Sequence, residues 1–179
     1  MSPDSSGRAG SVLVVPTAAA MKQLGRSIAT VVRPGDVLVL TGDLGAGKTT
    51  FTQGLGEGLG IRGPVTSPTF VIARVHPSLI EGPALVHVDA YRLGSALELD
   101  DLDLDADLDA GVTVVEWGRG VAEQLSDDRL EVTVGAGQDS EERTVTVVGV
   151  GPRWEASSAR EALAAVLAQA RTAAYGTDG

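Results

Sequence analysis

The chain has 179 residues, a formal net charge of −10 at pH 7 and no cysteine. This length predicts one domain with a sizeable core, and the lack of cysteine excludes disulfides and cysteine metal sites. So acidic a chain is not expected to bind a nucleic-acid backbone strongly, because such binding needs clustered lysine and arginine, but binding to a protein that carries nucleic acid is not excluded.

One domain is predicted over residues 11–174, between a disordered start at 1–10 and a disordered tail at 175–179. The start is polar and shows no signal peptide. Since the apolar segments are also too short to span a bilayer, the sequence favours a soluble cytoplasmic protein.

The first half of the domain predicts strands that alternate with helices. Strands are expected at 12–15, 36–41, 69–75 and 84–90, and helices at 18–32 and 49–59. Thr17 is a suitable N-cap for the first helix, because its hydroxyl can accept a hydrogen bond from a backbone N–H of the first turn.

The second half predicts a buried strand, a hairpin and a long helix. The expected elements are a strand at 112–115, a short helix at 121–125, hairpin strands at 130–134 and 144–148, and an alanine-rich helix at 155–174. Apolar and polar residues alternate in the hairpin strands, which is typical of strands with one solvated face. Together the elements predict a single α/β domain with a mostly parallel central sheet, an antiparallel flank and helices on both faces.

A phosphate-binding loop (P-loop) is predicted between the strand at 36–41 and the following helix. The run Gly42-Asp43-Leu44-Gly45-Ala46-Gly47-Lys48-Thr49 matches G-x-x-x-x-G-K-T in the required strand–loop–helix context. The glycines allow backbone N–H groups to point at phosphate oxygens, and the helix adds its positive end. Lys48 is expected to reach the β- and γ-phosphates, and Thr49 to offer its hydroxyl to Mg²⁺.

Acidic residues end two of the predicted strands. Glu116 follows the apolar run 111–115, and Asp89 follows 85–88. Both strands are expected to deliver their carboxylates to the edge of the sheet beside the P-loop, where Mg²⁺ needs oxygen ligands. The alternatives are a solvated strand-end acid for Glu116 and a helix cap for Asp89. His87 is interpreted as a packed strand residue rather than a ligand.

Four motifs in chain order resemble the bacterial TsaE family. They are G-D-L-G-A-G-K-T-T at 42–50, S-P-T-F at 67–70, H-V-D-A-Y-R-L at 87–93 and E-W at 116–117, within a match from about Pro16 to Gly151. The resemblance implies a small P-loop ATPase that acts with the TsaB–TsaD pair to make threonylcarbamoyladenosine (t6A), a modified base beside the anticodon of tRNA. In that family TsaD transfers the threonylcarbamoyl group, and TsaE binds the TsaB–TsaD complex and is needed for repeated turnover.

The resemblance also implies roles for individual residues. The P-loop from Gly42 to Thr50 would hold the triphosphate of ATP, and Thr49 and Glu116 would ligate Mg²⁺. Asp89 would lie near the metal or the attacking water, either as a ligand or as a base that positions the water. Thr69 would be a switch residue near the γ-phosphate, although a turn-forming S-P-T is the alternative interpretation.

Four further residues are candidates for nucleotide or partner contacts. Tyr91, Arg92 and Trp117 match the family pattern, which implies partner contact or shaping of the site, and Arg143 is a candidate to hold the nucleotide. ATP is favoured over GTP, because the chain contains no asparagine and therefore no N-K-x-D guanine motif. Arg92 is the candidate to act as an arginine finger in cis, and a partner protein is the alternative donor in trans. We therefore expect slow ATP hydrolysis by the isolated chain and faster hydrolysis in the complex.

Three other hypotheses follow from the sequence. The acidic run at 98–109 is not a good calcium loop, since Ala110 occupies the position that needs glycine, and a solvated face or a partner-docking surface is preferred. A small-molecule kinase is disfavoured, because the arginines between Gly118 and Arg153 are scattered rather than clustered in a lid. A non-hydrolysing ATP-sensing module, in which ATP orders a docking surface, remains the alternative to an ATPase.

Overall fold

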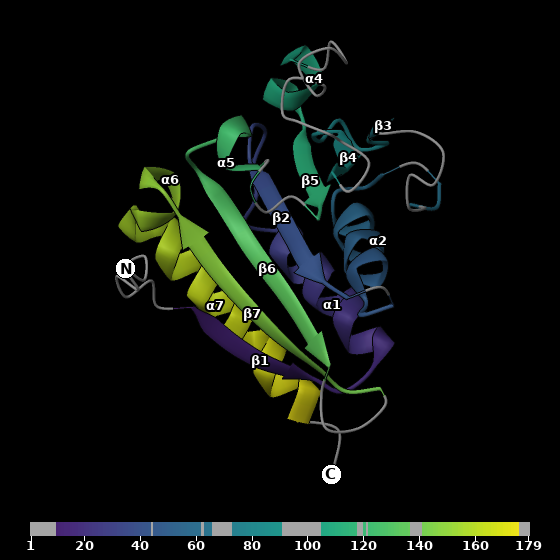
Figure 1. Cartoon of the computed structure of the whole chain (residues 1–179), viewed down its shortest axis with the longest axis vertical. Coiled ribbons are helices and arrows are strands. Elements are labelled where there is room, and N and C mark those ends of the chain that lie inside the picture. The colour runs from purple at the N-terminus through teal and green to yellow at the C-terminus, as the bar shows by residue number, and fades with distance from the viewer. Residues whose placement is uncertain are drawn as a thin grey trace.

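The computed structural model describes residues 10–43, 45–61, 63–65, 73–90, 105–117, 120, 122–136 and 141–175. These residues form a seven-stranded sheet with helices packed against it (Figure 1). The strands are β1 Ser11–Val15, β2 Val37–Gly42, β3 Ala73–His76, β4 Leu85–Asp89, β5 Val112–Glu116, β6 Arg129–Ala136 and β7 Arg143–Val150. The helices are α1 Ala18–Ala29, α2 Lys48–Gly58, α4 Asp105–Ala110, α5 Ala122–Leu125, α6 Pro152–Glu155 and α7 Ser157–Tyr175.

The sheet has a parallel centre and antiparallel edges. Its strand order is β1-β7-β6-β2-β5-β4-β3. β2 runs parallel to β5 and to β6, and β4 runs parallel to β5. The pairs β1–β7, β6–β7 and β3–β4 are antiparallel. The predicted α/β fold with a parallel centre is therefore confirmed, and the antiparallel part occupies both edges of the sheet.

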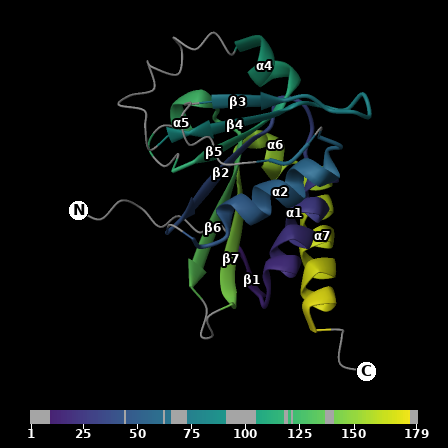
Figure 2. The same ribbon diagram turned by 90° about the vertical axis from the view of Figure 1, so that its right-hand side faces the viewer.

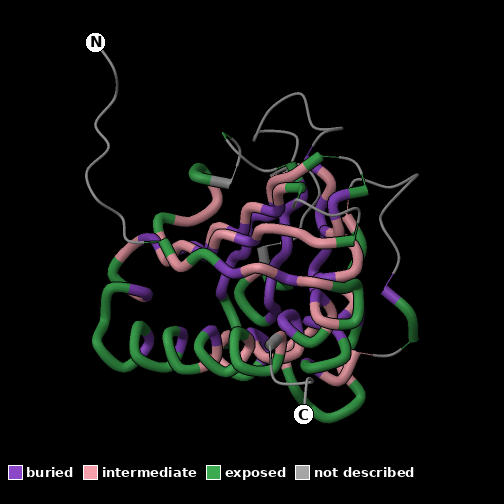
Figure 3. Tube along the Cα trace, turned by 90° about the horizontal axis from the view of Figure 1, so that it is seen from below, coloured by how far each residue is buried: buried purple, intermediate pink, exposed green. Residues whose placement is uncertain are grey.

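Helices cover the two faces of the sheet unequally. The larger apolar core lies between the sheet and the helices α1, α2 and α7, which stand together on one side in Figure 2. On the opposite face, Leu108 of α4 and Leu125 of α5 pack against a smaller group of valines from the sheet. Buried residues accordingly concentrate between the layers, while the outer helix faces are exposed (Figure 3). Among the described residues, no helix has both the length and the apolar character needed to span a membrane.

The start of α1 follows the sequence prediction. Thr17 Oγ1 accepts a hydrogen bond from Ala20 N at 3.1 Å, as expected of an N-cap. Met21, Leu24 and Ile28 recur at helical spacing and are buried on the face toward the core. The helix ends at Ala29 rather than at the predicted position 32, because the backbone N–H groups of Thr30 and Val31 bond to the carbonyls three residues earlier, at 3.2 and 3.0 Å, instead of continuing the i−4 pattern.

Two glycines bring α1 and α2 into close backbone contact. A Cβ on Gly54 of α2 would lie 1.9 Å from Lys22 O, and one on Gly25 of α1 would lie 2.3 Å from Phe51 O. Since α2 carries the end of the P-loop, this packing fixes where the loop lies relative to the core.

We expect Gly54→Ala to lower the free energy of unfolding by about 1–3 kcal/mol, which is the usual cost of overpacking. The clash is with backbone, which cannot turn aside, so it outweighs the helix propensity of about 1 kcal/mol that alanine gains over glycine. Gly135→Ala is the matched control, because its nearest neighbour would be Thr144 O at 3.7 Å. Urea unfolding of both variants checks the prediction, and equal stability would contradict it.

Three further differences from the predicted elements have local causes. Residues Asp105–Ala110 form α4, so the first half of the candidate calcium loop is helical. The predicted helix at 155–174 corresponds to α7, which begins at Ser157, because Ala156 adopts an extended conformation with ψ of 132° and separates it from the short helix α6. Of the strand predicted at 69–75, β3 contains 73–75, and 66–72 lie outside the described residues. Residues 1–9 and 176–179 also lie outside them, so disorder there stays a prediction, whereas Tyr175, predicted as the start of the tail, is the last residue of α7.

Candidate functional site

The P-loop lies at the carboxyl end of β2, in the parallel centre of the sheet, and α2 begins at Lys48. Gly47 comes directly before α2 and has a φ of 111°, a left-handed conformation that glycine adopts without steric cost. A Cβ on Gly42 would lie 2.5 Å from Val134 O of β6, so a larger residue would push the loop away from its neighbouring strand. The loop therefore runs directly into the start of α2 at the sheet edge, and the N-terminus of a helix is a favourable setting for phosphate.

Lys48 is folded back onto its own loop. Its Nζ donates hydrogen bonds to Gly42 O at 2.5 Å and to Asp43 O at 3.0 Å. The same ammonium lies 4.2 Å from the ring centroid of Trp117, in cation–π geometry. Trp117 has a φ of 60°, which is unusual for a bulky residue, and its backbone N–H donates to the carbonyl of Leu40 at 3.0 Å.

Burial and charge act in opposite directions on Lys48. Burial lowers the pKa of the Lys48 ammonium, and the carboxylates of Glu116, Asp43 and Asp89 partly oppose that shift. The carboxylates of these three acids thus interact electrostatically with the Lys48 ammonium. The edge of the sheet therefore combines one buried cation with three carboxylates, and a divalent cation at this edge would offset part of the negative charge.

The carboxylates of Asp89 and Glu116 come from adjacent parallel strands. Asp89 of β4 and Glu116 of β5 are Cα partners, and Leu40 of β2 is the next partner of Glu116. Partners in register point to the same face of a sheet, and this face carries α2. Glu116 is buried, with 5% of its surface exposed, while Asp89 is partly exposed. The two predicted acids therefore lie side by side next to the P-loop.

A buried histidine adjoins the Glu116 carboxylate. His87 has no exposed surface, and its Nε2 lies 3.2 Å from Glu116 Oε1. The approach is close but not aligned as a hydrogen bond: among the described residues, both ring nitrogens of His87 and Oε1 of Glu116 have no hydrogen-bond partner. His87 is packed within its strand, as the sequence analysis expected, and also lies against the predicted site.

The residues present fit a P-loop magnesium site. Within the described part of the chain, no cluster of three or more His, Cys, Asp or Glu could hold a metal by itself. A P-loop site does not need one, because phosphate oxygens and water complete the ligand set around one hydroxyl and one or two carboxylates. Thr49 is the second residue of α2, and the buried Glu116 Oε1 lacks a hydrogen-bond partner among the described residues. A cation is a natural partner for a buried carboxylate of this kind.

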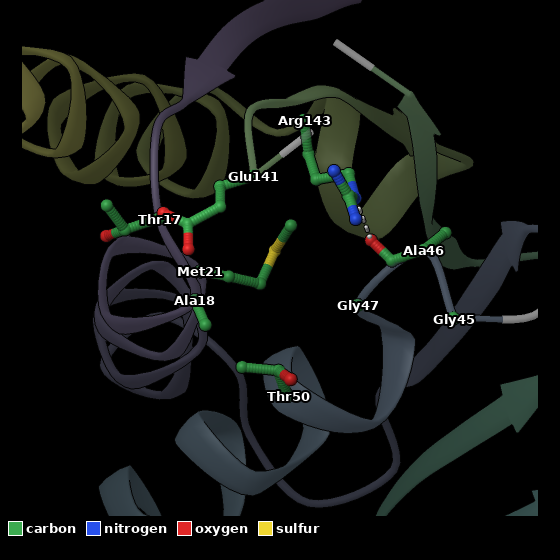
Figure 4. A pocket seen from close by; sticks show the side chains of 9 residues that line it. All are labelled: Thr17, Ala18, Met21, Gly45, Ala46, Gly47, Thr50, Glu141 and Arg143. Carbon is green, nitrogen blue, oxygen red and sulfur yellow. Dashed lines mark hydrogen bonds between the residues drawn. The ribbon is translucent and has the colours of Figure 1, made fainter. Parts of the chain in front are cut away.

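A cavity of about 200 Å³ lies on the other side of the P-loop (Figure 4). It is lined by Thr17, Ala18, Met21, Gly45, Ala46, Gly47, Thr50, Glu141 and Arg143. Arg143 Nε donates to Ala46 O at 3.0 Å, so this arginine is tied directly to the P-loop. Since β7 and β5 lie on opposite sides of β2 in the sheet order, Arg143 and the acids flank the loop from opposite directions.

Several residues of this region are not recognisable as site residues from the sequence. Thr17 was predicted only as a helix cap, and Met21 and Glu141 were not singled out. No local signal connects them to the P-loop, since their proximity depends on how α1 and β7 pack. Leu44, Thr69, Tyr91 and Arg92 lie outside the described residues, so their assignments stay predictions.

Comparison of the chain with known proteins identifies the protein family to which its sequence is similar. The model of the family described as "Threonylcarbamoyl adenosine biosynthesis protein TsaE" matches residues 15–145. A Streptomyces coelicolor protein named tRNA threonylcarbamoyladenosine biosynthesis protein TsaE is 60% identical over 138 residues, 75% of this chain and 93% of the relative. Its namesake from Bacillus subtilis is 44% identical over 135 residues, 75% of this chain and 82% of that protein.

A solved structure agrees with these relatives. The crystal structure of Bacillus subtilis YdiB superposes with a TM-score of 0.68 and 32% identity, covering 91% of this chain and 99% of YdiB. The family model spans the P-loop, both strand-end acids and Arg143. The chain therefore belongs to the TsaE family.

Proposed function

We propose that the chain is a Mg²⁺-dependent ATPase that supports t6A formation in tRNA together with the TsaB–TsaD complex. The observation that carries this proposal is the meeting of Lys48, Asp89 and Glu116 at one edge of the sheet. The relatives' names support the place in t6A biosynthesis. The charged edge beside a P-loop supports the chemistry, because phosphoryl transfer depends mainly on positioning and on charge stabilisation.

The residues at this edge have complementary tasks in the proposal. Lys48 exchanges its two loop carbonyls for phosphate oxygens, and Thr49 and Glu116 hold Mg²⁺. When bound, Mg²⁺ offsets negative charge on the β- and γ-phosphates. Asp89 lies beside Glu116 and either joins the ligand set or orients the attacking water. Thr69 remains the proposed switch residue near the γ-phosphate.

The cavity beside the P-loop is the proposed place for the adenosine part of ATP. It opens next to Gly45, Ala46 and Gly47, and its wall includes the apolar side chain of Met21 (Figure 4). A flat base suits an apolar wall with a few polar groups at its rim. Arg143 stands at that rim and bonds to the P-loop, which supports its predicted role in holding the nucleotide.

The positions of the described arginines argue against a small-molecule kinase. Arg129 pairs with Glu131 at 2.8 Å, and Arg153 pairs with buried Asp36 at 3.0 Å. A kinase acceptor site needs several arginines available for a second anion. These two are held within the fold, and Arg143 is bonded to the P-loop.

The proposal is tested by steady-state ATP hydrolysis with Mg²⁺, by the purified chain alone and with TsaB–TsaD and tRNA. We expect slow hydrolysis alone and stimulation of about tenfold or more in the complex, since a partner can supply an arginine finger in trans. Arg92 is the candidate in cis. Omission of Mg²⁺ is expected to abolish both rates.

A control and two outcomes complete this test. Bovine serum albumin in place of TsaB–TsaD controls for non-specific stabilisation. Equal rates with and without the complex would contradict partner activation. Tight ATP binding with no hydrolysis under any condition would instead favour the ATP-sensing module.

A further inference from the structure

The charged edge contains one buried group to which the proposed reaction assigns no task, namely His87. It lies in the middle of β4, fully buried, and its register partner on β5 is Val114. Glu116 follows two residues later on the same face of β5, which explains the approach of 3.2 Å between His87 Nε2 and Glu116 Oε1. The contact therefore results from strand register and not from a flexible side chain that happens to fold inward.

The Glu116 carboxylate needs a partner of this kind. A buried carboxylate is costly unless hydrogen bonds or opposite charge compensate for lost hydration. Lys48 contributes attraction, but its Nζ is engaged by the carbonyls of Gly42 and Asp43. Within the described residues, His87 Nε2 is the polar side-chain atom in direct contact with Glu116 Oε1.

We propose that His87 is a positioning residue, whose Nε2–H holds one oxygen of Glu116 so that the carboxylate is preoriented for Mg²⁺. The inference rests on the proposed function, since it presumes that Glu116 faces the metal. Side chains that orient metal ligands by hydrogen bonding typically change metal affinity by about 10- to 100-fold when removed. The 3.2 Å separation of Nε2 and Oε1 is already within hydrogen-bond distance, so alignment requires reorientation of the groups and not a closer approach.

Three substitutions at this position separate hydrogen bonding from packing. His87→Leu removes the donor while retaining a buried side chain. His87→Gln keeps an N–H at about the reach of Nε2, whereas His87→Asn carries its amide too close to the backbone to reach Glu116. His76→Leu is the matched control, because His76 is also a buried histidine and lies on the neighbouring strand β3. Burial lowers the pKa of its imidazole.

The readout is equilibrium binding of a non-hydrolysable ATP analogue with a β–γ imido bridge, measured in EDTA and across a Mg²⁺ titration. We expect His87→Leu and His87→Asn to raise the Mg²⁺ dissociation constant by about 10- to 100-fold. Affinity in EDTA should stay within about twofold of wild type for every variant, because His87 does not contact the nucleotide in the proposal. His87→Gln should recover most of the loss, and His76→Leu should match wild type.

The possible results are distinguishable. A wild-type Mg²⁺ constant in His87→Leu, or equal losses in EDTA and in Mg²⁺, would overturn the positioning role alone. If the leucine variant fails to fold by circular dichroism, the glutamine–asparagine pair decides, and equal constants for these two overturn the role. If wild type itself binds the analogue equally with and without Mg²⁺, the proposed magnesium site is wrong, and the role of His87 is wrong with it.

Discussion

Replacing Glu116 by glutamine is expected to reduce Mg²⁺-dependent ATP hydrolysis by about 100- to 1000-fold. A metal ion contributes several kcal/mol of charge stabilisation to such a transition state, and each 1.36 kcal/mol corresponds to a factor of about ten in rate. Glutamine keeps the volume and the buried position of Glu116 but removes its charge. Nucleotide binding in EDTA should therefore persist, and the loss should be confined to Mg²⁺-dependent steps.

The stability of the same variant separates a functional residue from a structural one. Glu116 Oε1 is buried without a hydrogen-bond partner among the described residues, so the fold compensates its desolvation poorly. We expect the thermal midpoint of Glu116→Gln to equal or exceed that of wild type. Activity lost while stability is kept is the signature of a site residue that the fold tolerates rather than needs.

Glu57→Gln is the matched control for this experiment. Glu57 lies on α2, away from the P-loop, and forms exposed ion pairs with Lys22 at 2.8 Å and with Arg26 at 2.7 Å. Exposed pairs of this kind contribute little, so hydrolysis should be unchanged. If Glu116→Gln hydrolysed ATP at the wild-type rate in the TsaB–TsaD complex, the carboxylate would have no part in catalysis, and the ATP-sensing module would be favoured.

Much of the fold is predictable from the chain because its signals are local. The G-x-x-x-x-G-K-T run, the buried strand before Glu116 and the alternating hairpin strands each determine their own conformation. The helix α4 is not predictable in this way, since its D-A-D-L-D-A sequence has weak helix propensity and resembles a solvated acidic loop. Packing of Leu108 against the sheet supplies what propensity lacks.

In the candidate site, too, the features set by local sequence are predictable and those set by packing are not. Adjacent strand-end acids can be placed beside a P-loop from sequence, because parallel strands deliver their carboxyl ends to one edge. The contact between His87 and Glu116 cannot, since it requires the pairing of β4 with β5 in one register. The cavity near Met21 and Arg143 likewise depends on α1 and β7 meeting the P-loop, and no spacing in the chain records that.

Lys48 determines whether the P-loop recognises charge or only shape. Its ammonium bonds to two carbonyls of the loop and lies over Trp117, and burial lowers its pKa. Phosphate offers the same donors a full negative charge, and hydrogen bonds to charged groups contribute about 1.5–3 kcal/mol each. Replacing carbonyl oxygens with phosphate oxygens is thus favourable, and Lys48 is already located where the exchange needs it.

Lys48→Ala is therefore expected to weaken ATP affinity by about 10- to 100-fold and to lower the hydrolysis rate at saturating ATP by a further 100- to 1000-fold. The first loss corresponds to one or two charge-assisted hydrogen bonds, and the second to the removal of a preorganised donor from developing charge. Calorimetric titration with ATP and hydrolysis in the TsaB–TsaD complex measure the two effects separately. The chain has only one other lysine, Lys22, which pairs with Glu57 on the surface, so Lys22→Ala controls for loss of positive charge. Wild-type ATP affinity in Lys48→Ala would mean that the loop does not bind phosphate through this residue. Equal losses of affinity in Lys48→Ala and Lys22→Ala would mean that the effect comes only from the change in net charge.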